Sequence, residues 1–219
     1  MAVSVIIPTL NEAERVGDAV DAAFLAGAAE VIVVDAGSTD TTVANARARG
    51  ARVIEGVQVR ARQLNRGAEA AAHDQLIFVH ADTLLPAGAA DAVERAIRGG
   101  AIFGGFRLRF LEGGPRLAYV AFMINARTRL TRAPWGDQAQ FVHRDAFPGY
   151  PDFPIMEDYE LARRMKRKGR TALLPLHVRT SGRRFLQKGV ILTSAVNWLI
   201  IVGYHFGIAP ARLARWYRR

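Results

Sequence analysis

Cysteine is absent from the 219 residues, and its absence removes several kinds of chemistry at once. Without cysteine the chain can form no disulfide, no thiolate metal site and no thiol nucleophile. Such a chain suits a reducing compartment, and we expect a cytoplasmic protein. Low-complexity tracts are also missing, and half of the residues are hydrophobic. The chain can therefore bury a full core, either as one large domain or as one domain with a small extension.

Two common phosphate-binding motifs are missing as well. The residues "PTLNE" follow the first expected strand, where a dinucleotide-binding protein would have its glycine-rich fingerprint, and no P-loop with a Lys-Ser/Thr ending occurs. These absences argue against a Rossmann dehydrogenase and a P-loop kinase. The N-terminus "MAVSVIIPTLNEAE" has no basic leader, and its apolar run is too short for a signal peptide. We interpret this run as the first strand of the fold.

The formal net charge is +10, which raises the question of a nucleic-acid or membrane partner. The basic residues concentrate in "RRMKRKGR" (163–170), "RTSGRR" (179–184) and the tail "ARLARWYRR" (211–219). Neither interleaved aromatic residues nor a recognisable reading helix accompanies them, so we expect no nucleic-acid partner. Phosphates on a small ligand or on lipid headgroups fit this pattern better.

The first hundred residues alternate between short apolar runs and helical spacing. Strands are expected at 3–7, 31–34, 52–54 and 76–79, with Pro8 ending the first, and helices at 12–26, 41–49 and 63–72. Continuous apolar strands that alternate with helices predict a parallel sheet with right-handed crossovers. This half of the chain is thus expected to be a nucleotide-binding type of α/β fold.

The pattern changes after Pro86. Helices are expected at 89–98, 116–129 and 157–168, with a strand at 101–110 that Gly104 and Gly105 bend or bulge, and another in "WGDQAQFVHR". Additions of this α+β kind usually build the substrate side of a site at the carboxyl edge of the sheet.

Residues 189–210 carry no Asp, Glu, Lys or Arg, so their length alone would allow a membrane span. Polar residues interrupt the run, and both flanks are basic, so a helix packed on the domain, on a second copy of the chain or flat on a membrane is favoured. We therefore expect residues 186–219 to form a helical extension that either lies at a membrane surface or joins two copies of the chain. If it lies at a membrane, we expect the inner membrane face. Trp216 and Tyr217 would suit an interfacial anchor, or a solvated helix end.

Polar side chains follow three of the expected strands at their carboxyl ends. Thr9, Asn11 and Glu12 follow the first, Asp35 the second, and His80 and Asp82 the fourth. A single acid at a strand end is more often a cap or turn residue, and we assign Asp40 to capping. Three acids at successive ends of parallel strands meet at one edge, where open α/β sheets bind their ligands.

Five motifs stand in an order that resembles the family 2 glycosyltransferases of the GT-A fold. They are "SVIIPTLNEA", "VIVVDAGSTDTT", "RARQLNRGAEAA", "LIFVHADTLLP" and "PIMEDYELARRM". With "WGDQ" and "TSGRRF", they look most similar to a subgroup of radical-SAM/selenodomain-associated, or arsenosugar-biosynthesis-type, transferases. The resemblance implies a GT-A domain at 1–185 that transfers a sugar with inversion from a UDP- or GDP-linked donor to an unidentified acceptor, using Mn²⁺ or Mg²⁺.

The resemblance also implies roles for individual residues. "HAD" matches the family's Asp-x-Asp metal motif, in which Asp82 is the remaining acid and His80 is either a second ligand or a hydrogen-bonded strand end. Ala36 stands where many relatives have an acid that contacts the nucleotide base. The resemblance therefore does not decide whether the base of the donor is uracil or guanine. The donor-binding residues implied are Pro8, Thr9, Leu10, Glu12, Asp35, Arg62, Asn65, Ala81, Arg183 and Arg184.

The catalytic candidates lie in "MEDYELARR", after a loop rich in proline. Asp158 of the Glu157-Asp158 pair would act as the general base, and Asp137 is the rival base or an acceptor ligand. Trp135 would stack on an acceptor sugar, or be a buried structural residue. Two other functions remain as alternatives: an inactive transferase-like protein that binds membrane surfaces, and a sugar-nucleotide pyrophosphorylase. The second would need an early glycine-rich loop, which "PTLNEAERVG" does not provide.

Overall fold

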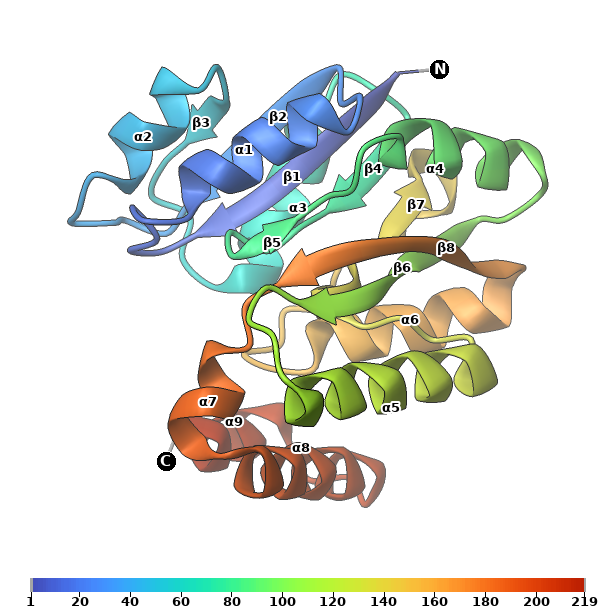
Figure 1. The fold of residues 1–219 in the computed structure, drawn as a ribbon. Coiled ribbons are helices and arrows are strands. Elements are labelled where there is room, and N and C mark those ends of the chain that lie inside the picture. The colour runs from blue at the N-terminus through green and yellow to red at the C-terminus, as the bar shows by residue number, and fades with distance from the viewer. Residues whose placement is uncertain (1, 219) are drawn as a thin grey trace.

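The computed structural model describes residues 2–218, in which a mixed sheet is covered by helices on both faces (Figure 1). The sheet order is β3-β2-β1-β4-β7-β6-β8-β5. Strands β1 to β4 run parallel, as predicted, and β7 is antiparallel to both of its neighbours. The strands are β1 (Val3–Thr9), β2 (Glu30–Asp35), β3 (Arg52–Ile54), β4 (Gln75–Phe78), β5 (Thr83–Leu84), β6 (Phe103–Phe110), β7 (Phe141–His143) and β8 (Thr171–Thr180).

The helices divide between the two faces of the sheet. Apolar residues of α1, α2 and α4 pack on one face, and those of α3 and α6 pack on the other. A third apolar cluster joins α8 and α9 to the start of α6. The helices are α1 (Val16–Leu25), α2 (Thr42–Ala48), α3 (Arg60–Ala70), α4 (Ala89–Arg98), α5 (Pro115–Thr131), α6 (Glu157–Lys168), α7 (Arg183–Lys188), α8 (Val190–His205) and α9 (Pro210–Arg218).

We predicted that Pro8 would end the first strand, but the strand continues to Thr9. Proline lacks an N–H and normally disrupts a central strand. Here the pairing between β1 and β4 stops at Ile6, which faces Phe78, so no strand of the sheet lies beside Pro8 on that side. On its other side, β1 keeps its register with β2 through Pro8 and Thr9. The extra residue brings Thr9 to the carboxyl edge of the sheet.

The longest strand, β8, was not predicted, because Pro175 interrupts its apolar pattern. The strand pairs in parallel with β6, and the register shifts between Phe106 and Arg107, opposite Pro175 and Leu176. The irregularity therefore lies beyond Gly104 and Gly105, where we had expected a bend or bulge. The two glycines serve close packing instead: a Cβ on Gly104 would lie 2.2 Å from the carbonyl oxygen of Ala172.

The segment "WGDQAQFVHR" is a strand only at Phe141–His143, because its first part forms a 3-10 turn at Gly136–Gln138. The apolar run at 189–210 forms α8 and then turns at Gly207, which has a φ of +80°. The predicted boundary at 185 lies inside α7. No helix among residues 2–218 combines the length and the hydrophobicity that crossing a membrane would require.

Candidate functional site

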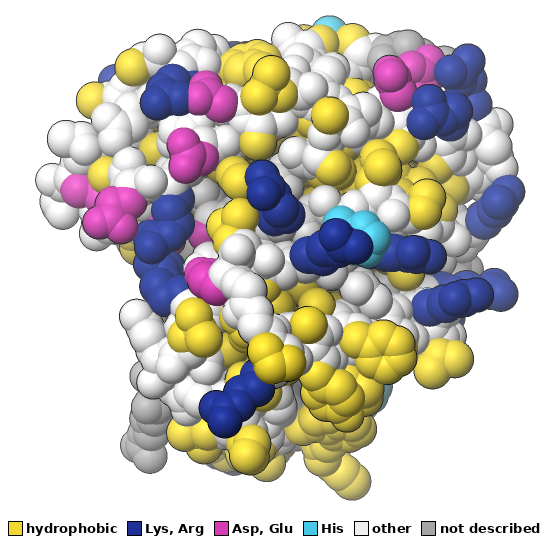
Figure 2. Space-filling view, in the orientation of Figure 1, with side chains coloured by type: hydrophobic (Ala, Val, Ile, Leu, Met, Phe, Trp, Pro, Cys, Tyr) yellow, Lys and Arg dark blue, Asp and Glu magenta, His cyan; other side chains and the backbone are white. Residues whose placement is uncertain are grey.

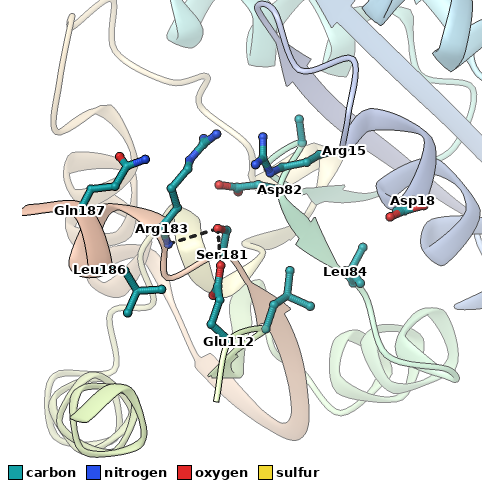
Figure 3. A pocket seen from close by; sticks show the side chains of 11 residues that line it. Arg15, Asp18, Asp82, Leu84, Glu112, Ser181, Arg183, Leu186 and Gln187 are labelled. Carbon is teal, nitrogen blue, oxygen red and sulfur yellow. Dashed lines mark hydrogen bonds between the residues drawn. The ribbon is translucent and has the colours of Figure 1, made fainter. Parts of the chain in front are cut away.

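A pocket of about 440 Å³ opens beside the carboxyl ends of β1 and β4. Arg15, Asp82 and Arg183 point into the same space, although they come from three separate parts of the chain (Figure 3). The turn that follows β4 supplies Ala81 and Asp82, and α7 supplies Arg183, Leu186 and Gln187. Of the polar residues predicted at the strand ends, Asp82 lines this cavity, whereas the other five (Thr9, Asn11, Glu12, Asp35 and His80) are not among its lining residues.

Asp82 and Glu12 form a pair of carboxylates in this region. Burial raises the pKa of Asp82, and Arg183 and Arg15 offset part of this effect. Burial and the negative charge of Asp82 also raise the pKa of Glu12, whose Oε2 atom is buried and accepts no hydrogen bond. Arg183 lies 3.9 Å from Glu12. Arg15 also lies 3.5 Å from Glu12, yet the pKa of both carboxyl groups stays raised because they are buried. A bound cation would favour their ionised forms.

This donor set fits Mg²⁺ or Mn²⁺, which bind hard carboxylate oxygens. In the part of the chain that the structure describes, no three His, Asp or Glu side chains are arranged to hold a metal by themselves. Such an ion would need further oxygen ligands, and the phosphates of a nucleotide supply oxygens of this kind. His80 is not among the residues that line the pocket and interacts instead with Arg60 and Asp158.

Asp35 is buried and its carboxylate holds its own loop. It accepts hydrogen bonds from the N–H groups of Gly37 and Ser38, at 2.8 and 2.7 Å, and from the hydroxyls of Ser38 and Thr9. These bonds lower its pKa although burial opposes them. Four donors fill the acceptor positions of a carboxylate. Asp35 and Thr9 thus hold the loop at 35–38 in place. Leu10 is exposed and Pro8 is buried within β1, and none of these four residues lines the pocket.

A second group of polar side chains surrounds Asp158, at the start of α6; we call it the Asp158 cluster (Arg60, His80, Gly136, Glu157 and Asp158). Asp158 accepts hydrogen bonds from the N–H groups of Gly136 and Tyr159, both at 2.7 Å. Arg60 lies 2.7 Å from Glu157 and 3.9 Å from Asp158. Each oxygen of Asp158 is thus held by a backbone donor, which fixes the orientation of the carboxylate.

Two members of this cluster, Arg60 and Gly136, were not predicted from the sequence. Arg60 was given no role from the sequence, and its ion pairs with Glu157 and Asp158, both distant in the chain, distinguish it from a solvated arginine on a helix surface. Gly136 was not considered, although a Cβ at this position would lie 2.9 to 3.0 Å from Asp158, His80 and Arg60. The backbone of Gly136 therefore comes closer to these groups than any other residue type would allow. Its place inside "WGDQ" was the signal that could have identified it.

Asp137 and Trp135 lie next to the Asp158 cluster. Burial raises the pKa of Asp137 to about 6, and its Oδ1 atom is buried without a hydrogen-bond partner. Arg127 stacks on Trp135, 3.5 Å from the ring centroid, and Tyr159 meets the same ring edge-on. Arg127 therefore covers one face of Trp135, whose side chain is half-buried.

Three residues predicted to bind the donor contact other parts of the protein. Arg62 forms a bidentate ion pair with Asp152, at 2.6 and 3.0 Å, and Asn65 exchanges two hydrogen bonds with the backbone of Tyr150. Both residues fasten the loop that leads to Glu157 and Asp158. Arg184 stacks on Tyr217 at 3.5 Å and is not among the residues that line the pocket.

We expect Asp137→Asn to stabilise the protein at neutral and alkaline pH but not at acidic pH. The pKa of Asp137 is higher in the folded chain than in the unfolded chain, so its ionisation favours unfolding. The variant should exceed the wild type by on the order of 2–3 kcal/mol in unfolding free energy at about pH 8, and by close to zero at about pH 4. Urea denaturation at the two pH values measures this difference. Burial lowers the pKa of His80 to about 3, so protonation of His80 favours unfolding at acidic pH. This effect is present in both proteins and does not contribute to the difference between their unfolding free energies. A difference that does not depend on pH would contradict the prediction.

Comparison with solved structures identifies several similar folds. Glucosyl-3-phosphoglycerate synthase from Mycobacterium tuberculosis, solved with Mn²⁺ and UDP-glucose, is 25% identical, with a TM-score of 0.56 over 80% of this chain and 69% of that one. Mannosyltransferase PcManGT from Pyrobaculum calidifontis, solved with GDP-Man and Mn²⁺, is 22% identical, with a TM-score of 0.63 over 82% of this chain and 56% of that one. S. aureus TarS is 18% identical, with a TM-score of 0.63 over 83% of this chain and 60% of that one.

The chain thus spans between 56% and 69% of the length of these three proteins. None of the curated proteins compared with it matches by sequence. The family model described as "Glycosyl transferase family 2", in contrast, matches residues 4–150, which include the pocket residues Arg15 and Asp82 and extend to the loop before α6. The fold is of the GT-A type, and the chain belongs to glycosyl transferase family 2.

Proposed function

We propose that this protein is an inverting glycosyltransferase that moves a sugar from a UDP- or GDP-linked donor to an acceptor, with Asp158 as the general base. The observation that carries the proposal is the pair of sites on either side of the turn at His80–Asp82. Asp82 lines the pocket with Arg15 and Arg183, Glu12 interacts with all three, and His80 lies in the Asp158 cluster. A donor diphosphate in the first site would direct its sugar towards the second.

The donor class is supported by the charge of the pocket. Arg15 and Arg183 are cations suited to a diphosphate, on which negative charge increases as the sugar leaves. The synthase from M. tuberculosis, at 25% identity, was solved with UDP-glucose and Mn²⁺. Asp82, with Glu12 close by, would hold a divalent ion in this chain. When bound, such an ion neutralises charge on the diphosphate. Leu10, which is exposed, would contact the nucleoside.

The transfer step needs a base that is held in place. The acceptor oxygen attacks the anomeric carbon and forms a new C–O bond, while the bond to the diphosphate breaks and its electron pair stays on the diphosphate oxygen. Asp158 takes the proton of the acceptor. The N–H groups of Gly136 and Tyr159 keep its carboxylate oriented, and Arg60 connects it to Glu157. Attack opposite the leaving group inverts the configuration of the sugar.

Acceptor recognition is assigned to the residues around Trp135 and Asp137. Trp135, which is half-buried, would stack on an acceptor, and Asp137, in the 3-10 turn that follows it, would accept one of the acceptor's hydrogen bonds. We also propose, from "WGDQ" and "TSGRRF", that the chain belongs to the radical-SAM/selenodomain-associated or arsenosugar-biosynthesis-type subgroup. The domain division at 1–185 and 186–219 is proposed on the same resemblance.

Thermal melting with nucleotide sugars tests the donor site. We expect UDP- or GDP-sugars, together with Mn²⁺, to raise the melting temperature by roughly 5 °C or more at a hundredfold excess over Kd. The same nucleotide without metal should give a much smaller shift, because the negative phosphates would then face Asp82 and Glu12 directly. Adenosine diphosphate with Mn²⁺ is the control for nonspecific phosphate binding.

The absence of any metal-dependent shift with both nucleotide classes would overturn the proposed donor site. The main alternative, an inactive transferase-like protein at membrane surfaces, predicts binding without turnover. Release of UDP or GDP from the stabilising nucleotide sugar, measured with water or a panel of acceptors, separates the two. Release that disappears in the Asp158→Asn protein supports the enzyme, and binding without release supports the alternative.

A further inference from the structure

One face of α8 exposes a continuous apolar stripe to solvent. Ile191, Trp198 and Phe206 retain 86%, 68% and 84% of their surface exposure, respectively. Leu192, Leu199 and Val202 lie at the intervening helical positions and are also exposed. Spacings of three and four residues put these side chains on one side of the helix. The opposite side, with Thr193, Ile200 and Gly203, is buried against the protein.

The stripe continues onto the neighbouring helices. Tyr119, Phe122 and Met123 of α5 are exposed by 64%, 65% and 49%, and Leu186 of α7 is exposed by 58%. Helices α5 and α7 both contact α8. Figure 2 shows hydrophobic side chains gathered at the lower end of the molecule, where Figure 1 places these helices. We call this surface, made by the named residues of α5, α7 and α8, the α5–α8 face. Apolar patches of this kind normally mark a binding surface.

The helices that carry and adjoin the α5–α8 face contain charged residues of one sign only, although Glu112 contacts Gly182 just before α7 and Glu160 contacts Tyr204 of α8. Helices α5, α7, α8 and α9 contain no Asp or Glu. All 20 acidic residues of the chain lie before position 161, whereas the last 59 residues contain 14 of the 30 Lys and Arg. Among the side chains whose exposure the structure describes, the exposed basic residues on these helices are Arg116, Arg129, Lys188, Arg212 and Arg215. The helices that carry the exposed apolar side chains, together with α9, therefore present positive charge and contribute no negative charge of their own.

We propose that the α5–α8 face docks on an anionic lipid bilayer, with α8 lying flat in the headgroup region. Apolar and aromatic side chains on one side of a helix, together with surrounding Lys and Arg, are the features of interfacial helices. A second copy of the chain fits less well, because two such faces would bring positive charge against positive charge. An anionic bilayer supplies both the apolar phase and the opposite charge.

The docked helix would lie close to the proposed catalytic residues. The buried side of α8 packs on Met156, which immediately precedes Glu157. Tyr159 is 2.7 Å from His205, and Tyr204 donates a hydrogen bond of 2.8 Å to Glu160. A helix with its side chains is about 10–12 Å thick, so the start of α6 would lie roughly one helix diameter above the bilayer. The docking proposal itself does not depend on the transfer reaction.

Vesicle binding of the intact protein tests the proposal. Vesicles of equal parts phosphatidylcholine and phosphatidylglycerol should sediment the protein, and vesicles of phosphatidylcholine alone should sediment roughly tenfold less. Added salt should weaken the binding, because it screens the charge contribution. Brominated lipid should quench the tryptophan fluorescence of the wild-type protein, since Trp198 would lie among the acyl chains.

Substitutions on the α5–α8 face provide the matched comparison. The double variant Trp198→Ser and Phe206→Ser should bind anionic vesicles at least roughly tenfold more weakly. Because both side chains are exposed, its melting temperature should stay close to that of the wild type. Leu25→Ser removes a side chain that is 80% exposed at the end of α1, outside the face, and should bind as the wild type does.

Three results would overturn the proposal. The first is wild-type protein that stays in the supernatant with anionic vesicles, and the second is equal binding by the double variant. The third is a dimer, seen by light scattering, that Trp198→Ser converts to monomer while vesicles bind neither form, because the face would then join two copies. If the double variant proves unstable, the quenching of wild-type tryptophan fluorescence by brominated lipid tests the proposal by itself. An absence of quenching would then overturn it.

Discussion

The Asp158→Asn variant is expected to lose about a thousandfold in kcat while its Kd for the metal–nucleotide complex changes little. The carboxylate lies in the Asp158 cluster, where no residue of the pocket beside Asp82 makes a hydrogen bond to it. In the proposed mechanism, nucleotide binding and proton transfer would therefore depend on separate groups. Initial rates with the stabilising nucleotide sugar measure the first quantity, and titration calorimetry with the nucleoside diphosphate and Mn²⁺ measures the second.

The same substitution carries a structural cost that the controls must separate. Both oxygens of Asp158 accept backbone N–H groups, and the amide of Asn offers only one acceptor. We expect a loss of about 1–2 kcal/mol in unfolding free energy, too little to unfold a domain of this size at room temperature. Asp152→Asn is the matched control, because Asp152 pairs with Arg62 at the surface of the preceding loop. Retention of more than about a tenth of wild-type kcat in Asp158→Asn would exclude Asp158 as the base.

The Asp82→Asn variant is expected to lose metal-dependent nucleotide binding. In the presence of Mn²⁺ its Kd for the nucleoside diphosphate should rise about 100-fold, to a value close to that measured without metal. Its folding stability at neutral pH should not fall, because burial already raises the pKa of Asp82 and the neutral amide avoids the cost of the charge. Loss of binding together with unchanged stability would be difficult to explain by a structural role.

Asp18→Asn provides the control for this second variant. Asp18 also lines the pocket, but it lies in the first turn of α1, where an acid has the ordinary role of interacting with the helix dipole. Its replacement should leave the Mn²⁺-dependent Kd within about twofold of the wild type. The proposed metal role of Asp82 would be wrong if Asp82→Asn and Asp18→Asn bound the nucleotide equally well with Mn²⁺.

Local patterns were sufficient to predict the nucleotide-binding half. Each of β1, β2 and β4 is a continuous apolar run followed by a turn, and parallel strands must bring their carboxyl ends to one edge. That rule alone placed Glu12 and Asp82 near each other, and the negative charge of Asp82 does raise the pKa of Glu12. The strand β8 was missed because the bulge that accommodates Pro175 depends on its pairing with β6.

The Asp158 cluster could be predicted only in part. "MEDYELARR" identified Asp158, but the partner that holds Glu157 is Arg60, almost a hundred residues earlier in the chain. The direction of the Gly136 N–H depends on a short 3-10 turn, and nothing in the local sequence specifies where it points. Arg62, Asn65 and Arg184 were assigned to the donor by resemblance, whereas their contacts are with the loop at 150–152 and with Tyr217. Side-chain partners that are distant in sequence decide these roles.

Crystals grown with Mn²⁺ and the stabilising nucleoside diphosphate test the central claim most directly. We expect the ion to bind Asp82 and the two phosphates, with Arg183 turned towards the diphosphate and Asp158 facing the side from which an acceptor enters. Nucleotide density elsewhere on the protein, or an ion bound without any contact to Asp82, would contradict this account.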